Sequence, residues 1–291
     1  MGEAAQRKKL EQAIQAAKTP AGLATKRETY ARNWSEKDAA AFARDGHYAW
    51  MASHVGGKHR VLEIGTGDGS GTIELLRAGH VVVSVDENPS CLGRAGVNIS
   101  SAGFPVVTEL RGTAHQGEDG YEVKYEPITS PEATTGALLI EGDTLNDPSL
   151  LSWLRSMPPF DAVVCWLMGS HRARQLNLAL PRVSAGLYRL HVQNKLYEFA
   201  DTVLQSDGIL NIVDRGTIGT TPAAIEILNA DLFRSHEEQA SPTSLRVDAM
   251  VETRPYKASA SGVKMEMTVG SSGLVFADIE LGLTSIVARK P

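Results

Sequence analysis

The chain has 291 residues, 42% of them hydrophobic, which is enough for one large domain or one domain with appendages. A formal net charge of −5 argues against a dedicated nucleic-acid binder, which would carry a basic excess. The two cysteines, Cys91 and Cys165, lie far apart without the spacing of a metal pair, which excludes a disulfide framework and fits a reducing cytoplasm.

The N-terminal part of the chain predicts a helical extension. Residues 1–20 are polar and lack the apolar core of a signal peptide, and no run approaches the roughly 18 apolar residues of a membrane span. We therefore expect a cytoplasmic protein without a membrane partner. Residues 1–58 predict helices, one over 8–17 and a second that Ser35 caps.

Aromatic and imidazole side chains gather at the end of this extension, before the first strand. Tyr30 and Trp34 are followed by His47, Tyr48 and Trp50. These side chains either form a lid over a ligand or anchor the extension on the sheet. The sequence leaves both interpretations open.

Residues 60–71 (RVLEIGTGDGSG) join a short apolar run to a turn with glycine at every second position, and a helical pattern follows. A strand that breaks into a glycine-dense turn and then a helix presents backbone N–H groups to a concave space. Such a turn suits a ligand that lies close against the main chain, and we predict a binding loop here.

The body that follows alternates strands and helices, which is typical of a mostly parallel sheet with helices on both faces. After the run that precedes the glycines, parallel strands are predicted over 80–86, 137–141, 160–166 and 208–214. The runs 106–110 and 121–125 flank a turn-like segment and predict a β-hairpin inserted within 105–127. Alternating runs predict antiparallel strands that finish the sheet, over 245–251, 263–269, 274–281 and 285–288. The main domain is therefore expected to cover 59–291.

Two acidic residues define the ligand further. Asp86 ends a predicted strand about 20 residues after the loop, where a carboxylate can accept hydrogen bonds from ribose hydroxyls. The dinucleotide fingerprint G-x-G-x-x-G does not fit, because its last glycine would fall on Ser70 or Thr72. Glu63, two residues before the first glycine, would repel a pyrophosphate and attract an amino group. The loop therefore predicts a ligand with an amino-acid moiety.

These motifs resemble those of the class I S-adenosylmethionine-dependent methyltransferases. The matching segments stand in the same order and cover roughly residues 58–215: VLEIGTGDGSG at 61–71, VVVSVDEN at 81–88, LLIEGDT at 138–144, FDAVVCW at 160–166 and ILNIVD at 209–214. The resemblance implies a Rossmann-like fold, S-adenosyl-L-methionine as the cofactor and methyl transfer as the activity. The C-terminal strands fit the last antiparallel strands of that fold loosely.

Carried over residue by residue, the resemblance implies cofactor contacts at the strand ends. Glu63 would hold the ammonium group of the cofactor, Asp86 its ribose and Asp143 its adenine amino group. The full implied set is Glu63, Gly65, Thr66, Gly67, Asp68, Gly69, Asp86, Glu87, Asp143, Thr144, Cys165 and Trp166, of which the last two would border the methyl group. Asp143 has a structural alternative as a helix N-cap or turn residue, and Trp166 as a core side chain.

Methyl transfer from a sulfonium needs mainly positioning and electrostatics, although some acceptors also need a general base. His171, in the segment that follows the strand at 160–166, is the candidate base. Its alternative is a surface histidine beside a helix. Arg172 and Arg174 either bind an anionic substrate or form a solvated face.

The substrate is constrained mainly by missing motifs. Residues 165–168 lack the paired prolines of enzymes that methylate base amines of DNA and RNA, and no paired carboxylates for a metal follow Asp161. We expect no metal and a small-molecule acceptor, with a protein side chain as the alternative, and leave a homodimer open. An NAD-type dehydrogenase and a non-catalytic cofactor-binding module remain competing hypotheses.

Overall fold

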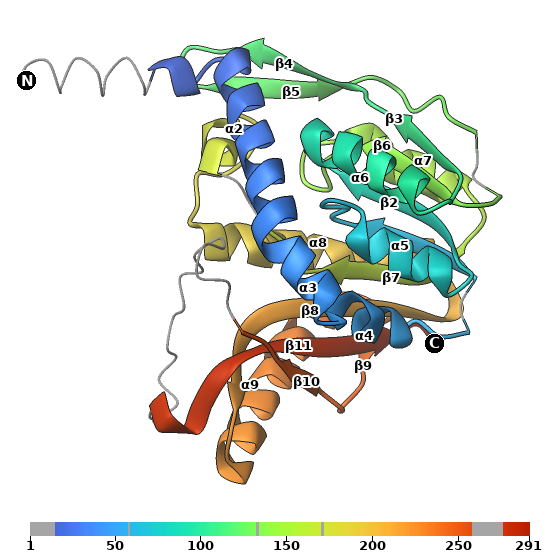
Figure 1. Ribbon diagram of the computed structural model, residues 1–291, viewed down its shortest axis with the longest axis vertical. Coiled ribbons are helices and arrows are strands. Elements are labelled where there is room, and N and C mark those ends of the chain that lie inside the picture. Colours follow the sequence, from blue (N-terminus) through green and yellow to red (C-terminus); the bar gives the residue numbers. More distant parts are fainter. Residues whose placement is uncertain (1–14, 58, 132–133, 170–171, 258–275) are drawn as a thin grey trace, which may run out of the picture.

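Strands that are buried on both faces form the centre of the molecule. The computed structural model describes residues 15–57, 59–131, 134–169, 172–257 and 276–291 (Figure 1). The central strands are β1 (Arg60–Ile64), β2 (Val81–Asp86), β6 (Ala137–Glu141) and β7 (Phe160–Trp166). Their residues are almost all buried, as expected of parallel strands with helices on either side.

The main sheet is mostly parallel and has an antiparallel C-terminal edge. In the part of the chain that the structure describes it has nine strands, in the order β10 (Glu252–Pro255), β11 (Ile279–Arg289), β8 (Leu204–Gly219), β7, β1, β2, β6 and β3 (Val106–Glu109), with β9 (Arg246–Val247) paired to β11. The pairs from β3 to β8 are parallel, whereas β11 is antiparallel to β8, β9 and β10. The expected α/β, Rossmann-like fold is thereby confirmed.

Helices cover both faces of this sheet. They are α2 (Pro20–Asn33), α3 (Ala40–Arg44), α4 (His47–Ser53), α5 (Ser70–Arg77), α6 (Pro89–Ser101), α7 (Pro148–Ser156), α8 (Ala185–Val203) and α9 (Pro222–Ala240), with a π-helical turn η1 (Trp34–Ala39) and 3₁₀ turns η2 (Arg172–Leu176) and η3 (Phe276–Asp278). α2, α6, α7 and α9 each have proline in the first turn, directly after a capping side chain. Those caps satisfy N–H groups at the helix start, so local sequence sets where these helices begin.

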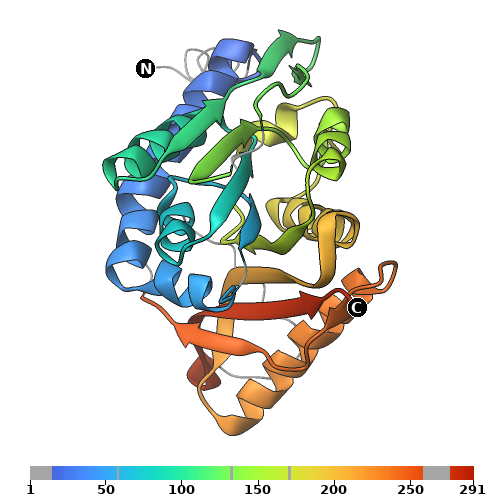
Figure 2. The same cartoon turned by 90° about the vertical axis from the view of Figure 1, so that its right-hand side faces the viewer.

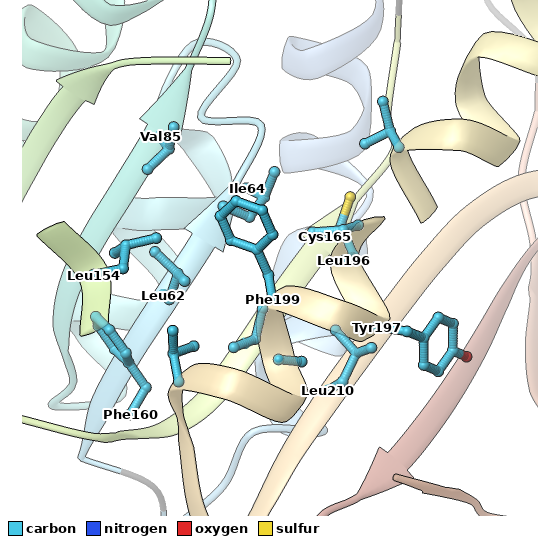
Figure 3. Packing of buried hydrophobic residues seen from close by; sticks show 14 of the residues in the cluster. Leu62, Ile64, Val85, Leu154, Phe160, Cys165, Leu196, Tyr197, Phe199 and Leu210 are labelled. Atoms are coloured by element: carbon cyan, nitrogen blue, oxygen red, sulfur yellow. The ribbon is translucent and has the colours of Figure 1, made fainter. Parts of the chain in front are cut away.

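Two apolar layers hold the helices against the sheet. Helices α3 to α6 lie on one face of the sheet, and α7 and α8 lie on the other (Figure 2). The side chains of each group form an apolar layer with the strands. Leu62, Phe160 and Leu210 of the strands meet Leu196 and Phe199 of α8 in the second layer (Figure 3). The site described below lies at the carboxyl edge of the sheet, where residues of both layers line it.

The hairpin predicted within 105–127 is present, but one of its two strands differs from the prediction. The strand expected over 106–110 is β3, which runs parallel to β6 at the edge of the main sheet. The hairpin consists of β4 (Gly112–Gln116) and β5 (Tyr121–Tyr125), which form a separate two-stranded sheet. β4 occupies residues that the sequence had suggested were a loop, because their alternating polar and small side chains carry little strand signal.

Other boundaries also differ from the predictions. Ser35 does not cap a helix: α2 continues into η1, and the Ser35 hydroxyl donates to Asp68 instead. Residues 279–281 of the strand expected over 274–281 and the whole strand expected over 285–288 belong to the single long strand β11, whereas 276–278 form η3. β10 was not predicted. The expected strand over 263–269 and most of the expected helix over 8–17 lie outside the described residues.

Arg111 joins the hairpin to the main sheet. Its buried guanidinium donates to the backbone oxygens of Glu126 and Glu141, to the Ser149 hydroxyl and to the Asp147 carboxylate that caps α7. A single side chain thus connects the start of β4, the end of β6 and the start of α7.

We predict that Arg111→Met lowers the free energy of unfolding by about 3–5 kcal/mol, because Asp147 would stay buried without its cation. Chemical unfolding followed by tryptophan fluorescence would measure the loss. Arg155→Met, an exposed arginine on α7, is the control and should change it by no more than about 0.5 kcal/mol. A loss below about 1 kcal/mol in Arg111→Met would contradict the connecting role.

Candidate active site

A pocket opens at the carboxyl edge of the central strands. It encloses about 840 Å³ of empty space, part of which is open to solvent. Its walls come from the ends of β1, β2, β6 and β7, from α2 and η1, and from α8. Such pockets lie where strands of an open α/β sheet end.

The glycine loop after β1 forms the floor of the pocket. Gly65 and Gly67 have φ angles of 94° and 57°, in the left-handed region that favours glycine. A Cβ at Gly67 would lie only 2.9 Å from Nε1 of Trp34. The loop is therefore restricted to glycine both by its backbone and by the side chain above it.

Asp86 ties this loop to the end of β2. One carboxylate oxygen accepts the N–H of Gly67 at 3.0 Å, and the other accepts that of Asn88 at 2.9 Å. Burial, supported by the neighbouring charge of Glu87, raises the pKa of Asp86 to about 7 in spite of these two bonds. Asp86 lines the pocket, and a carboxylate has lone pairs for more than two hydrogen bonds.

Glu63 is a second buried carboxylate in the pocket. It accepts the hydroxyls of Thr72 at 2.5 Å and Ser84 at 2.6 Å through one oxygen. Burial raises its pKa to about 7, although both hydroxyls oppose the shift. A carboxylate held this way favours a cation that could neutralise it.

Charged side chains from four segments meet at the opposite end of the pocket. Arg174 of η2 donates from Nη2 to Oδ2 of Asp143 at 2.6 Å, and its Nη1 lies 3.4 Å from Oε1 of Glu87. Arg27 of α2 donates to Oε2 of Glu87 at 2.7 Å and to its backbone oxygen at 2.6 Å. Glu87 thus bridges two buried arginines, and we call these four residues the ionic bridge.

Aromatic side chains enclose the pocket between these charged ends. Tyr30, Trp34 and Tyr48 come from the N-terminal extension, and Trp166 comes from the end of β7. The Trp166 indole N–H donates to Oδ1 of Asn211 at 2.7 Å, so its ring is fixed. Leu167, directly after it, has a φ of 57°, an uncommon value for a side chain with a Cβ that often accompanies functional sites.

The structure places most of the predicted cofactor residues in one wall. Those that line the pocket are Glu63, Gly65, Thr66, Gly67, Asp86, Glu87, Asp143, Thr144 and Trp166. Asp68, Gly69 and Cys165 are not among the lining residues. The predicted base His171 lies outside the described residues.

The three residues away from the pocket have other contacts. Asp68 accepts the hydroxyl of Ser35 and the N–H of Ser70 at the start of α5. A Cβ at Gly69 would come within 3.0 Å of Ala95, so this glycine allows α5 and α6 to approach. Cys165 points into the α7 and α8 layer, since neighbouring residues of a strand face opposite sides and Trp166 faces the other (Figure 3).

Asp143 and Trp166 each have a structural role and also line the pocket. Asp143 is not the cap of α7, a role that belongs to Asp147. It does accept the N–H of Leu145, as a turn residue does, and uses its other oxygen for Arg174. Trp166 belongs to the core layer and also lines the pocket.

Sequence reasoning missed Arg27 and treated Arg174 as a substrate ligand or a solvated residue. Both are buried, with exposed fractions of 6% and 8%. No local motif indicates either arginine, because the partners lie far away in the sequence. Glu87 is about 60 positions from Arg27, and the two partners of Arg174 are about 30 and about 90 positions from it. Among the described residues, no group of three or more His, Cys, Asp or Glu is placed to hold a metal, and no helix is long and apolar enough to cross a membrane.

Comparison with known proteins yields structural likeness only. No protein-family model matches the sequence, and no curated protein matches it. Similar solved structures include the N-methyltransferase NodS of Bradyrhizobium japonicum in complex with S-adenosylhomocysteine, with 11% identity, a TM-score of 0.45, and 89% of this chain and 90% of that chain covered. Another is magnesium protoporphyrin IX methyltransferase of Synechocystis, with 11% identity, a TM-score of 0.41, and 87% and 84% covered.

A third is a sarcosine dimethylglycine methyltransferase described as putative, from Galdieria sulphuraria, with 12% identity, a TM-score of 0.43, and 84% and 85% covered. The likeness of the chain to these three structures is one of fold. Because these likenesses are distant, its chemistry is argued from its own residues.

The pKa of Glu63 gives a prediction for stability. An acid whose pKa is raised in the folded state releases a proton more readily when unfolded, so its contribution to stability is full below about pH 4.5 and is lost as the pH rises through about 7. Glutamine cannot ionise, so Glu63→Gln should not lose stability through this group as the pH rises. We expect the variant to gain about 1–3 kcal/mol relative to the wild type between pH 4.5 and pH 8, measured by denaturant unfolding at each pH.

Glu122→Gln, an exposed carboxylate on β5, serves as the control and should follow the wild-type curve. Parallel curves for Glu63→Gln and the wild type over this range would show that Glu63 ionises as an ordinary surface acid does.

Proposed function

We propose that this protein is an S-adenosylmethionine-dependent methyltransferase. The observation that carries the proposal is the convergence of Glu63, the glycine loop, Asp86 and Asp143 in one pocket. Glu63, Asp86 and Asp143 come from the neighbouring strand ends of β1, β2 and β6. This order matches the amino acid, the ribose and the base of the cofactor. The residues fit the cofactor, because the cradle at Gly67 excludes a Cβ and acidic groups stand where hydroxyl and amino donors would lie.

The charge of the pocket supports a cationic ligand. Glu63, Asp86, Glu87 and Asp143 line it, whereas Arg174 is the only basic residue among its described lining side chains. The raised pKa values of Glu63 and Asp86 reflect the cost of keeping two carboxylates ionised in this enclosed space. A ligand with a sulfonium and an ammonium group would offset that cost. A dinucleotide, which adds phosphate charges, would increase it.

The protein contributes mainly positioning to such a reaction. When bound, the cofactor supplies an electrophilic methyl group on a sulfonium. Asp86, fixed by two backbone N–H groups, would hold the ribose, and Glu63 the ammonium group, directly or through water. Trp166, fixed by Asn211, forms the wall beside the end of β7. Fixed groups of this kind lower a barrier by orienting the reactants.

The walls support a small-molecule acceptor over a protein side chain. Tyr30, Trp34 and Tyr48 of the N-terminal extension line the pocket and restrict its opening. A residue in an intact protein surface would have to displace them, whereas a small planar or apolar molecule would pack between them. His171 remains the proposed base for acceptors that must lose a proton.

Calorimetric titration with S-adenosylmethionine, S-adenosylhomocysteine and NAD tests the cofactor. Micromolar binding of the first two and none of NAD is expected, and the reverse would identify a dehydrogenase-type site. Incubation with labelled S-adenosylmethionine and fractionated metabolites or proteins then tests transfer. Label in a small molecule supports the proposal, whereas tight cofactor binding without transfer to any fraction indicates a binding module.

Asp86→Ala tests the ribose contact. Loss of a charged acceptor for the ribose hydroxyls should weaken S-adenosylhomocysteine binding by about 10- to 100-fold, as measured by calorimetry. The melting temperature of the unliganded protein should change little, because the removed carboxylate is one that burial disfavours.

Asp161→Ala is the matched control. Asp161 also accepts two backbone N–H groups, from His59 and Arg60, but at the amino edge of the sheet. This variant should bind S-adenosylhomocysteine like the wild type. If Asp86→Ala unfolds readily while its folded fraction binds normally, Asp86 only stabilises the loop.

A further inference from the structure

Arg174 stands in the pocket wall at the position expected for the ligand's base. Its guanidinium spans from Asp143, after β6, to Glu87, after β2. The guanidinium carbon also lies 4.3 Å from the centre of the Tyr188 ring, which lines the same pocket. These contacts fix the guanidinium between the two strand ends, with one face against an aromatic ring.

The cation has hydrogen-bonding capacity left in this position. A guanidinium carries five N–H donors and no acceptor. Nη2 donates to Asp143 and Nη1 lies near Glu87, whereas Nε has no hydrogen-bond partner among the described residues. Burial would lower the pKa of Arg174, but Asp143 and Glu87 raise it above its ordinary value, so the group stays charged. A buried arginine with unused donors beside an acceptor can recognise a ligand edge.

We propose that Arg174 is a specificity-determining residue that reads the base together with Asp143, the arginine donating to a ring nitrogen and the carboxylate accepting from the neighbouring amino group. The inference rests on the proposed function, since it concerns the adenine of that cofactor. It assigns a role to a residue that would otherwise serve only to neutralise two carboxylates.

The chemistry of the base explains the selectivity of such a pair. Adenine presents an amino donor at C6 with a ring-nitrogen acceptor on either side, N1 or N7. A carboxylate and a guanidinium side by side match that order of donor and acceptor. A carbonyl at C6 would place an oxygen against Asp143, leaving two acceptors opposed. The pair therefore favours an amino purine with an intact ring nitrogen.

Arg27 offers a matched comparison within the same ionic bridge. It is buried like Arg174 and pairs with the same carboxylate, Glu87. It does not line the pocket and makes no contact with Asp143 among those that the structure describes. Arg27→Met thus removes a buried cation beside Glu87 while leaving the base-reading pair complete.

The test measures binding of four ligands to the full-length wild type, Arg174→Met, Arg174→Lys and Arg27→Met by calorimetry. The ligands are S-adenosylhomocysteine, its 1-deaza and 7-deaza analogues, in which a ring nitrogen is a C–H group, and S-inosylhomocysteine, in which the amino group is a carbonyl. The wild type should bind one deaza analogue and the inosyl analogue about 10- to 100-fold more weakly than S-adenosylhomocysteine.

Arg174→Met should lose the discrimination against that deaza analogue, Arg174→Lys should retain part of it, and Arg27→Met should retain all of it. A structural role alone would weaken all ligands equally and leave their ratios unchanged, which would overturn the inference. Equal binding of S-adenosylhomocysteine and both deaza analogues by the wild type would overturn it without any variant. Failure of the wild type to bind S-adenosylhomocysteine would instead refute the proposed function.

Discussion

The carboxylate of Glu87 lies between two buried guanidinium groups, and this bridge determines how distant segments meet around the pocket. Arg27 brings α2 to the end of β2, and Arg174 brings η2 to the same place. Each arginine loses its hydration on burial and is stable only with a carboxylate close by. Among the described residues, removing Glu87 would leave Arg174 paired with Asp143 alone, and Arg27 with only Glu141, whose carboxylate lies 3.9 Å away.

The hairpin of β4 and β5 contacts the two segments that carry the arginines of the ionic bridge, α2 and the end of η2. Tyr121 of β5 pairs with Asn177, just after η2, and its backbone oxygen accepts the N–H of Leu178 at 2.8 Å. Leu23 of α2 packs against Tyr121 and Val123 in a small apolar cluster. The hairpin is joined to the main sheet by Arg111, so it holds both α2 and the turn that carries Arg174 in place.

Local chemistry explains which parts of the fold and site the sequence could predict. The glycine loop, Asp86 and the central strands are each specified within a few residues, by backbone angles, burial and strand period. The pairing of β3 with β6 depends on contacts about 30 positions apart, and a short alternating run is equally compatible with a hairpin. Sequence patterns did not identify Arg27 and Arg174 as parts of the ionic bridge for the same reason, since only the folded chain brings them to Glu87. The opposite orientations of Cys165 and Trp166, by contrast, follow from strand period alone, and a sequence argument could have separated them.

The electrostatics of the pocket connect its architecture with the proposed chemistry. Burial raises the pKa values of Glu63 and Asp86 by more than their hydrogen bonds lower them. At the other end, Asp143 and Glu87 are already compensated by Arg174. A ligand that is cationic at one end would offset the cost of burying the charges of Glu63 and Asp86. A base at its other end would add hydrogen bonds to the group of Asp143, Glu87 and Arg174. Under the proposed function, the two ends of the pocket would contact different parts of one molecule, and Arg174, which pairs with Asp143 and Glu87, would form part of the recognition surface.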